Sequence, residues 1–442
     1  MEQLSLYDLL YEKYKITKPI RLIELFSGYG SQALALKYLG VDFTHWRICE
    51  WATKSIQAYN DLHIRDYTDY SKDLTTDAVI ERLAAYGISM DYNKPMTLDQ
   101  IKRKGVKWIR NTYNNIIATH NLVDVSKAKA TNLNITDTEK FTYLLTYSFP
   151  CQDLSSVGLG KGMSRNSGTR SGLLWQVERI LNECEELPQV LLMENVPEII
   201  SQKNINDFRA WQLYLEKKGY SNFCEILNAK DYFLPQNRDR CYMVSILGNY
   251  NFKMPRANNL KYFLKDFVKL GADKRYYLAE SVLRTFTYFS GDKKSKKFKD
   301  LRGLRFNPQN IKTAKIANCI TTRACTDVVN NTYIIETPNL HYDNDKACFY
   351  IKNGNQKKYI DTFNNDIEIK IRKNTPKEAW ALMGVKNTDF TYVAKAQSIS
   401  SQYHLAGDSI VTTVLMAIFG ELLGIDYQSK ITELVEELKE CA

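Results

Sequence analysis

The sequence predicts an α/β protein with a doubly wound, mostly parallel sheet and a second, smaller domain. Short apolar runs typical of strands alternate with helical patterns through residues 1–248, and such alternation builds parallel sheets. From residue 249 the chain changes to short pieces rich in Tyr, Asn and Lys. A length of 442 residues also exceeds the roughly 250–300 residues at which single cores stop growing.

The periodicity of apolar residues gives the elements in order. A short amphipathic helix reaches Lys15, and a βαβ unit follows it. The expected strands are residues 20–26, 45–50, 141–149, 189–194 and 240–247, and the expected helices are 32–39, 53–59, 97–117, 172–182 and 409–423. The last helix carries apolar residues about every four positions, so we expect it to pack on the main core.

The same pattern divides the chain into regions. Residues 1–248 and 400–442 are expected to form the main domain, and residues 249–399 the smaller one. Residues 61–130 are polar and basic, with helical spacing and no strand signal, which predicts a helical insertion over the core.

Composition limits the classes of function. The net charge of +10 and the pI near 8.9 favour a polyanionic partner, because Lys and Arg release counterions when they neutralise phosphates. The nine cysteines form no CxxC pair, which fits a reduced compartment and predicts neither disulfides nor a metal site. The sequence has no signal-peptide pattern and no apolar stretch that we judge long enough to cross a bilayer. We therefore expect a cytoplasmic protein without membrane contact.

The first candidate site follows the first strand. Residues 26–30, Phe-Ser-Gly-Tyr-Gly, form a glycine-rich turn at the carboxyl edge of a parallel sheet, where open α/β folds bind ligands. The turn lacks the third glycine of a dinucleotide fingerprint, but Glu50 ends the second strand, where an acid accepts hydrogen bonds from ribose hydroxyls. This combination suits a nucleoside without a pyrophosphate. An ordinary strand-to-helix turn with a surface Glu is the alternative.

Three further strand ends carry reactive side chains. Cys151 follows Pro150 at the end of a strand, where its thiol is expected to be exposed. Glu194 ends the next strand, after an apolar stretch that should bury it partly and raise its pKa. Arg238 and Arg240 are spaced by two, so they should point to one side and lower the pKa of a thiol there. Taken singly, each motif has an ordinary alternative. Cys151 would be an inert buried thiol, Glu194 a helix N-cap partner or a solvated carboxylate, and the arginines a surface salt-bridge pair.

Together these motifs resemble those of the DNA (cytosine-5) methyltransferase family of bacterial and phage restriction-modification systems. The matching segments are Phe-x-Gly-x-Gly at 26–30, Glu-Trp at 50–51, Pro-Cys-Gln at 150–152, Glu-Asn-Val at 194–196, Gln-x-Arg-x-Arg at 236–240, Arg-Lys-Asn-Thr-Pro-Lys-Glu at 372–378 and Gly-Asp-Ser-Ile at 407–410. The order of the Pro-Cys-Gln, Glu-Asn-Val and Gln-x-Arg-x-Arg motifs is highly specific. The resemblance implies a Rossmann-like, S-adenosylmethionine-dependent methyltransferase fold with a target-recognition domain.

The resemblance also implies S-adenosyl-L-methionine as cofactor and a mechanism that flips the target base out of the duplex. The implied catalytic residues are Cys151 as nucleophile, Glu194, Arg238 and Arg240. Those implied around the cofactor are Phe26, Ser27, Gly28, Tyr29, Gly30, Ser31, Glu50, Trp51, Asn134, Ile135, Pro150, Leu173, Asp408, Ser409 and Ile410. Two of them depart from the family pattern: Asn134 stands where an Asp holds the adenine amino group, and Asp408 replaces an Asn.

The expected partner is double-stranded DNA bound by a monomer, with a cognate restriction endonuclease acting separately as a further possible partner. Implied substrate contacts are Pro150, Gln152, Ser155, Asn195, Gln236, Thr321 and Arg323. Segment 152–170 has the Gly- and Ser-rich composition of a loop that closes over a flipped base. The run Lys293–Lys299 is expected to touch phosphates or solvent. The basic residues of the insertion either contact the DNA backbone or form a solvated helix; they are Lys102, Arg103, Lys104, Lys107 and Arg110.

Three alternative functions stay open. A tRNA cytosine-5 methyltransferase shares the catalytic motifs, although about 120 residues between Leu247 and Arg372 favour a full target-recognition domain and hence DNA. A non-catalytic DNA-binding relative would not need the intact Cys151 and Glu194. A dehydrogenase would leave every motif after the glycine turn unexplained.

Overall fold

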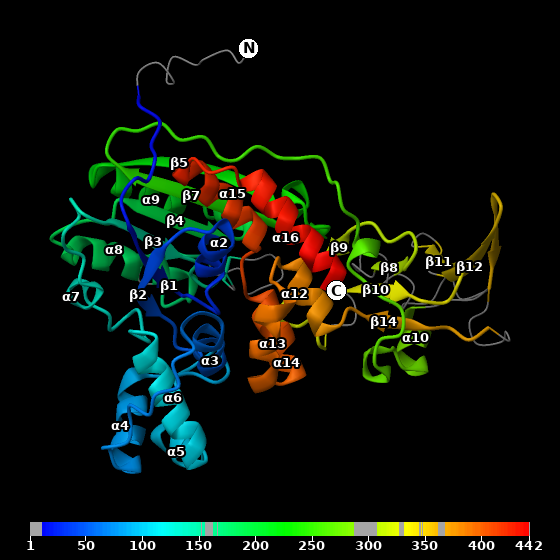
Figure 1. Ribbon diagram of the computed structural model, residues 1–442, viewed down its shortest axis with the longest axis horizontal. Helices are drawn as coiled ribbons and strands as arrows, with labels where there is room; N and C mark the ends of the chain where they lie inside the picture. The colour runs from blue at the N-terminus through cyan, green and yellow to red at the C-terminus, as the bar shows by residue number, and fades with distance from the viewer. Residues whose placement is uncertain are drawn as a thin grey trace.

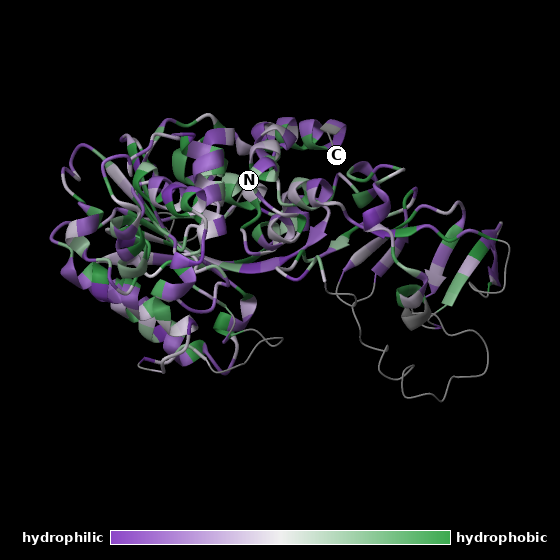
Figure 2. Cartoon of the chain, turned by 90° about the horizontal axis from the view of Figure 1, so that it is seen from below, coloured by the Kyte–Doolittle hydropathy of each residue, from purple (hydrophilic) through white to green (hydrophobic). Residues whose placement is uncertain are grey.

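The computed structural model describes residues 11–151, 153–154, 162–165, 167–286, 307–326, 331–343, 346, 348–360 and 367–441. A larger lobe, built around a six-stranded sheet, lies beside a smaller lobe of short strands (Figure 1). The helices of the insertion project from the larger lobe below α3 (Thr53–Tyr59). Figure 2 shows the same two lobes from below, with polar and apolar residues alternating along the helices of the larger lobe.

The central sheet has the strand order β2-β1-β3-β4-β7-β5. Its strands are β1 Ile20–Leu25, β2 Phe43–Cys49, β3 Thr142–Tyr147, β4 Val190–Asn195, β5 Tyr220–Asn228 and β7 Asp239–Leu247. Strands β1 to β4 are parallel, and β7 runs antiparallel between β4 and β5. The predicted doubly wound, mostly parallel sheet is confirmed, although β5 is not among the predicted strands.

Helices cover both faces of this sheet. Leu22 and Leu144 share a core cluster with α2 and α15 on one face, whereas Ile23 and Leu145 share another with α8 and α9. Successive strand side chains point to opposite faces, so a sheet buried on both sides needs this continuous apolar sequence. The helices of the larger lobe are α2 Ser31–Leu39, α7 Ala130–Leu133, α8 Leu174–Glu183, α9 Ile205–Lys217, α12 Pro376–Leu382, α13 Asn387–Ala396, α14 Ile399–Gly407, α15 Thr412–Leu423 and α16 Tyr427–Cys441.

The insertion is a small helical unit with its own apolar cluster. It contains α4 (Thr76–Tyr86), α5 (Leu98–Lys102) and α6 (Val106–Ala118), which pack through Val79, Leu83 and Ile109. The single helix expected over 97–117 is therefore two helices. The break falls at Gly105, which has an extended conformation and precedes the first residue of α6. Helix α4 is not among the predicted elements.

The smaller lobe consists of short strands around a separate apolar cluster that includes Tyr333, Ile335 and Phe349. Its sheets have the orders β14-β10-β8 and β11-β12-β13, and β9 pairs with β6 of the larger lobe. The strands are β6 Gln236–Asn237, β8 Asn307–Asn310, β9 Ala317–Asn318, β10 Thr332–Ile335, β11 Leu340–Asp343, β12 Cys348–Asn353, β13 Gln356–Tyr359 and β14 Ile371–Lys373, with the helix α10 Glu280–Phe286.

Helices α12 and α13 pack on the larger lobe. The Trp380 ring stacks on Tyr29 with centroids 4.7 Å apart, and Lys37 Nζ lies 2.8 Å from Asp389 Oδ1. We therefore propose that residues 376–399 belong with the main domain and not with the smaller one.

One segment is apolar enough to resemble a membrane span. Residues Ile399–Leu423, which cover α14 and α15, are long and apolar enough to cross a membrane by length and composition alone. The expectation that no apolar stretch is long enough to cross a bilayer was therefore wrong. However, 89% of its most apolar window is buried inside the protein. Its hydrophobicity is that of core helices: α15 packs against α2, as predicted for the tail helix, and α14 packs against α12.

Candidate active site

The loops that follow the parallel strands meet at one edge of the sheet. The amide of Phe26 donates to the carbonyl of Cys49 at 2.7 Å, which brings the turn after β1 against the end of β2. Ser148 Oγ lies 3.5 Å from the carbonyl of Phe26, so the end of β3 adjoins the same turn. Asn195 Nδ2 donates to the carbonyl of Phe149 at 3.0 Å and joins the end of β4. This carboxyl edge is where an open α/β sheet binds its ligands.

Glu50 closes the glycine turn from the side of β2. Its Oε2 accepts a hydrogen bond from the amide of Gly28 at 2.9 Å, and its Oε1 accepts one from the amide of Ala52 at 2.7 Å. Burial raises the pKa of Glu50 to about 7, although both amides lower it. Gly28 has φ +55°, and a Cβ built there would meet no heavy atom within 4 Å. A buried acid beside an open glycine backbone fits the sugar of a nucleoside cofactor.

The structure does not bring Asn134 and Ile135 to this edge. The carbonyl of Asn134 lies 3.4 Å from the hydroxyl of Tyr143, the second residue of β3, so the segment lies at the amino-terminal edge of the sheet. Asn121 stands beside Glu50 instead and exchanges two hydrogen bonds with its backbone, at 3.0 and 2.9 Å. Asn121 also bridges Ile48 of β2. The prediction was wrong because the insertion separates this segment from β2 and leaves sequence spacing uninformative.

Cys151 lies on a turn that is held by the start of α8. Ser171 Oγ donates to the carbonyl of Pro150 at 2.7 Å, and Asp153 Oδ2 accepts from the amide of Arg170 at 2.8 Å. Leu173 follows in the same segment and is half-buried. The thiol is half-buried as well, not exposed as expected, because Cys151 packs against the core cluster beneath β3.

Glu194 and Arg240 form an ion pair beside the nucleophile. Arg240 Nε lies 3.1 Å from Glu194 Oε1, and the two side chains are 17% and 11% exposed. Burial raises the pKa of Glu194, as the sequence predicts, while Arg240 and Arg238 lower it. A carboxyl group that can hold a proton beside a fixed guanidinium can protonate a ring nitrogen while the cation binds a neighbouring oxygen.

Burial dominates the electrostatics of the nucleophile. It raises the pKa of Cys151 to about 11; Arg240 acts against this rise, whereas Glu194 and Asp408 add to it. Arg240 and Arg238 both lower the pKa of this thiol, as the sequence predicts, but burial outweighs them and the net pKa is raised.

Arg238 clamps two distant segments together. Its Nη1 donates to the carbonyl of Ile320 at 2.8 Å, and its Nη2 donates to the carbonyls of Gly407 and Ser409 at 3.1 and 2.5 Å. These segments touch closely, because a Cβ on Gly407 would lie 2.1 Å from the carbonyl carbon of Thr321. Arg238 is 4% exposed and acts as a positioning residue.

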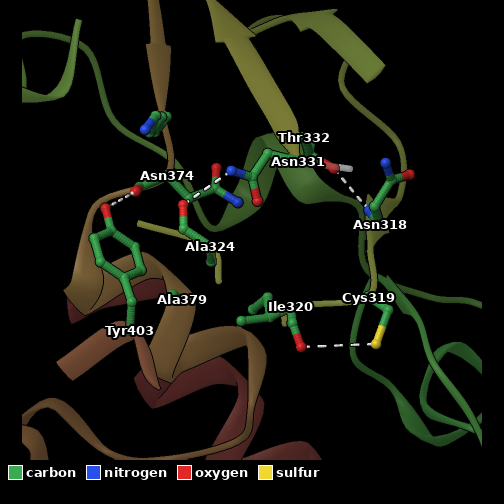
Figure 3. A pocket seen from close by; sticks show the side chains of 10 residues that line it. Asn318, Cys319, Ile320, Ala324, Asn331, Thr332, Asn374, Ala379 and Tyr403 are labelled. Carbon is green, nitrogen blue, oxygen red and sulfur yellow. Dashed lines mark hydrogen bonds between the residues drawn. The ribbon is translucent and has the colours of Figure 1, made fainter. Parts of the chain in front are cut away.

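Cys319 is a second thiol at the site that the sequence did not point to. Its Sγ lies 3.3 Å from Arg238 Nη1 and 3.9 Å from Arg240 Nη2, so both arginines do face one side. Burial opposes ionisation, but the two guanidiniums outweigh it and lower the pKa of Cys319. A cavity of about 20 Å³ lies behind this thiol, lined by Ile320, Asn374 and Tyr403 (Figure 3). That space holds about one water and no nucleoside.

Asp408 follows α14 and is exposed to solvent. Solvent reaches its side chain, yet the surrounding protein raises its pKa to about 7, with Arg238 lowering it and Glu194 raising it further. The charge of Asp408 also raises the pKa values of Glu50 and Cys151. Ser409 and Ile410, which follow it, are buried.

Two predicted contact residues are core residues instead. Gln236 is fully buried, donates to the carbonyl of Leu382 at 2.8 Å and accepts from the amide of Ile320 at 3.0 Å, so it does not face DNA. Tyr29 is 1% exposed and packs on Trp380, away from the cleft. Among the other predicted residues, those buried are Ser27, Gly30, Ser31 and Asn195, and those half-buried are Phe26, Trp51 and Pro150.

The predicted DNA contacts divide into three groups. Arg323 is exposed and Thr321 is half-buried. In the insertion, Arg110 donates to the carbonyls of Ser71 and Leu74 and is structural. The other basic residues of the insertion reach solvent, with Lys102, Arg103 and Lys107 exposed and Lys104 half-buried. Gln152, Ser155 and the run Lys293–Lys299 lie outside the described residues.

The fold and the side chains at the carboxyl edge of the sheet together define a class of protein. It is a Rossmann-like α/β protein in which this edge carries an acid suited to a nucleoside cofactor and a thiol near a carboxyl–guanidinium pair. The particular family follows from sequence. The family model described as C-5 cytosine-specific DNA methylase matches residues 99–424, and the chain belongs to this family.

Similar proteins carry methyltransferase names that agree with this family, and a solved structure agrees with the fold. The chain is 29% identical over 426 residues to the type II methyltransferase M2.ScrFI of Lactococcus lactis subsp. cremoris, covering 91% of this chain and 99% of that protein. It is 36% identical over 250 residues to the orphan methyltransferase M.SssI of Spiroplasma monobiae, covering 55% and 63%. The structure of the S. pombe Dnmt2 methyltransferase matches with a TM-score of 0.58 and 17% identity, covering 92% of this chain and 99% of that one, which shows the shared fold.

Proposed function

We propose that the chain transfers the methyl group of S-adenosyl-L-methionine to C5 of a flipped cytosine in a specific sequence of double-stranded DNA. The observation that carries this proposal is the meeting of Cys151, the Glu194–Arg240 pair and Glu50 at one sheet edge. The family and the net charge of +10 support it.

Cysteine addition activates the ring. Cytosine C5 is a weak nucleophile, so the Cys151 thiolate adds to C6 while Glu194 gives a proton to N3, and the resulting enamine is nucleophilic at C5. After C5 has taken the methyl group, the C5 proton leaves to solvent, the C6–S bond breaks and the N3 proton returns to Glu194. Arg240 holds the O2 oxygen, where negative charge develops during addition.

The free enzyme keeps its nucleophile protonated. With a pKa of about 11, the Cys151 thiol carries its proton at neutral pH, so thiolate formation is coupled to the arrival of the base.

The cofactor supplies an electrophilic methyl group on a sulfonium. The carboxylate of Glu50 would accept hydrogen bonds from the ribose hydroxyls, and Gly28 leaves room for the cofactor against its backbone. Asp408 would lie beside the reacting end, between Glu50 and Cys151.

The target base must leave the duplex to reach this site. The half-buried thiol at the foot of a sheet edge cannot contact C6 of a stacked cytosine, so the base is extruded at a cost of a few kcal/mol. We assign sequence recognition to the smaller lobe, about residues 249–375, facing the major groove.

The direct test uses labelled S-adenosylmethionine with varied duplex DNA, followed by bisulfite mapping of the modified cytosines. We expect methylation at one sequence context and none with Cys151→Ala. Duplex DNA carrying 5-fluorocytosine at that site should become covalently trapped, because the C5 fluorine cannot leave as a proton does.

Each alternative has its own outcome. Label on tRNA but not on duplex DNA would assign the tRNA activity, and equal labelling by Cys151→Ala would remove the nucleophile. Sequence-specific DNA binding without any methyl transfer would indicate a non-catalytic relative.

A further inference from the structure

The insertion reaches the cofactor site through the loop that follows α4. The amide of Ser89 donates to the carbonyl of Trp51 at 2.8 Å, and the carbonyl of Ser89 accepts from the amide of Thr53 at 2.9 Å. These two bonds form a parallel bridge directly after Glu50. The loop therefore begins beside the acid that faces the ribose in the proposed function.

Tyr92 spans the space between α3 and α14. Its ring lies 4.1 Å, centroid to centroid, from the ring of His404, and its hydroxyl lies 3.4 Å from Ser55 Oγ on α3. The amide of Asp408 donates to the carbonyl of His404 at 2.9 Å, so the stacked pair stands one turn before Asp408. Burial raises the pKa of the Tyr92 phenol, and Asp408 and Glu50 act in the same direction. Tyr92 therefore lies three residues after the bridge that adjoins Glu50 and stacks on a ring one helical turn before Asp408.

The backbone of Tyr92 is strained and held in place. Its φ of +60° lies in the left-handed region, which aromatic residues seldom adopt. Asp91 Oδ1 accepts hydrogen bonds from the amides of Asn93 and Lys94 at 2.9 and 3.1 Å, which fixes the turn. Arg170 Nη2 donates to Asn93 Oδ1 at 2.6 Å, which ties the loop to the segment that holds the nucleophile's turn. A strained residue with supports on several sides is typical of a functional position.

We propose that Tyr92 is a cofactor-binding residue of the insertion, whose ring forms the outer wall over the ribose and sulfonium part of S-adenosylmethionine. This inference rests on the proposed function and adds a residue from outside the shared motifs. The ring removes the stretch of cofactor between Glu50 and Asp408 from solvent, and its face favours a neighbouring sulfonium cation. The Asn93–Arg170 contact joins this wall to Arg170, whose amide donates to Asp153 Oδ2 two residues after Cys151.

The test is direct binding of S-adenosylmethionine and S-adenosylhomocysteine to the full chain by titration calorimetry. The main variant is Tyr92→Gly, because glycine adopts the observed φ without strain and keeps the loop folded. Tyr92→Phe keeps the ring, Glu50→Gln removes the acid, and Tyr70→Ala is the matched control, since Tyr70 is 40% exposed in the same insertion. Melting temperatures establish that each variant is folded.

We expect Tyr92→Gly to weaken binding of both ligands about tenfold, with KM for the cofactor rising in step and kcat changing less than about threefold. Tyr92→Phe and Tyr70→Ala should bind as the parent chain does. Parental affinity in Tyr92→Gly, together with lost binding in Glu50→Gln, would overturn the wall assignment alone. Absence of binding to the parent chain would overturn the proposed function itself.

Discussion

Replacing Glu194 by Gln should make Cys151 more reactive while making the enzyme less active. Burial holds the thiol pKa at about 11, two units above its ordinary 9.0, so the thiolate fraction at pH 8 is about a hundredfold lower than for a free cysteine. Glu194 contributes to this rise, and it also neutralises Arg240 at 3.1 Å. An uncharged Gln removes the repulsion and leaves the guanidinium free to favour the thiolate.

We expect the Cys151 pKa to fall by about one unit, because a nearby charge typically shifts a pKa by one to three units. The alkylation rate at pH 8 should therefore rise about tenfold. Methyl transfer should fall by about 10² to 10⁴, because Gln cannot give N3 a proton. The opposite directions of the two effects separate this explanation from general damage to the fold.

The assay follows iodoacetamide modification of the peptide that contains Cys151 by mass spectrometry between pH 7 and pH 10. Peptide resolution is needed because the structure describes other free cysteines. The control is Glu185→Gln, an exposed glutamate at which the same change should alter neither rate. A Glu194→Gln thiol that reacts at the parental rate or more slowly would refute the electrostatic reasoning.

Two further outcomes are expected. Asp408→Asn removes a carboxyl group whose pKa in the folded protein, about 7, lies above its ordinary 3.8, so ionisation of this group destabilises the fold as the pH rises from about 4 to about 7. The melting temperature of the variant should therefore exceed that of the parent at pH 8 and differ much less at pH 5. An equal gain at both pH values would contradict the raised pKa. Arg372→Leu removes the fully buried guanidinium that pairs with Glu336 and Glu378 and leaves both carboxylates without their cationic partner. It should cost about 3–5 kcal/mol in chemical unfolding, and a loss below about 1 kcal/mol would show that the pairs contribute little.

Much of the sheet and its edge could be predicted from sequence for a simple geometric reason. Four apolar runs mark β1 to β4, and parallel strands end at the same edge, so Glu50, Cys151 and Glu194 had to converge. The strand β5 carries exposed and half-buried side chains at the sheet margin, so its pattern is weak and periodicity missed it.

Burial and long-range contacts could not be predicted in the same way. The pKa of Cys151 depends on how much protein surrounds the sulfur, and a sequence motif carries no measure of that. Asn121 and Tyr92 lie in or beside a long insertion, and their partners Glu50 and His404 are far away along the chain. Neither residue belongs to a recognisable motif.

Arg238 and Arg240 show why a shared motif does not give shared roles. They are two residues apart and both contact Cys319, yet their other contacts differ. Arg240 pairs with Glu194 and remains 17% exposed, so in the proposed function it can bind the O2 oxygen of the base. Arg238 is occupied by three backbone carbonyls from segments that meet only in the folded chain. A Lys at position 238 would therefore lose the hydrogen bonds that join residue 320 to residues 407–409, and it would impair methyl transfer indirectly, through the position of Asp408. A Lys at position 240 would impair methyl transfer directly, through its contact with the cytosine ring in the proposed function.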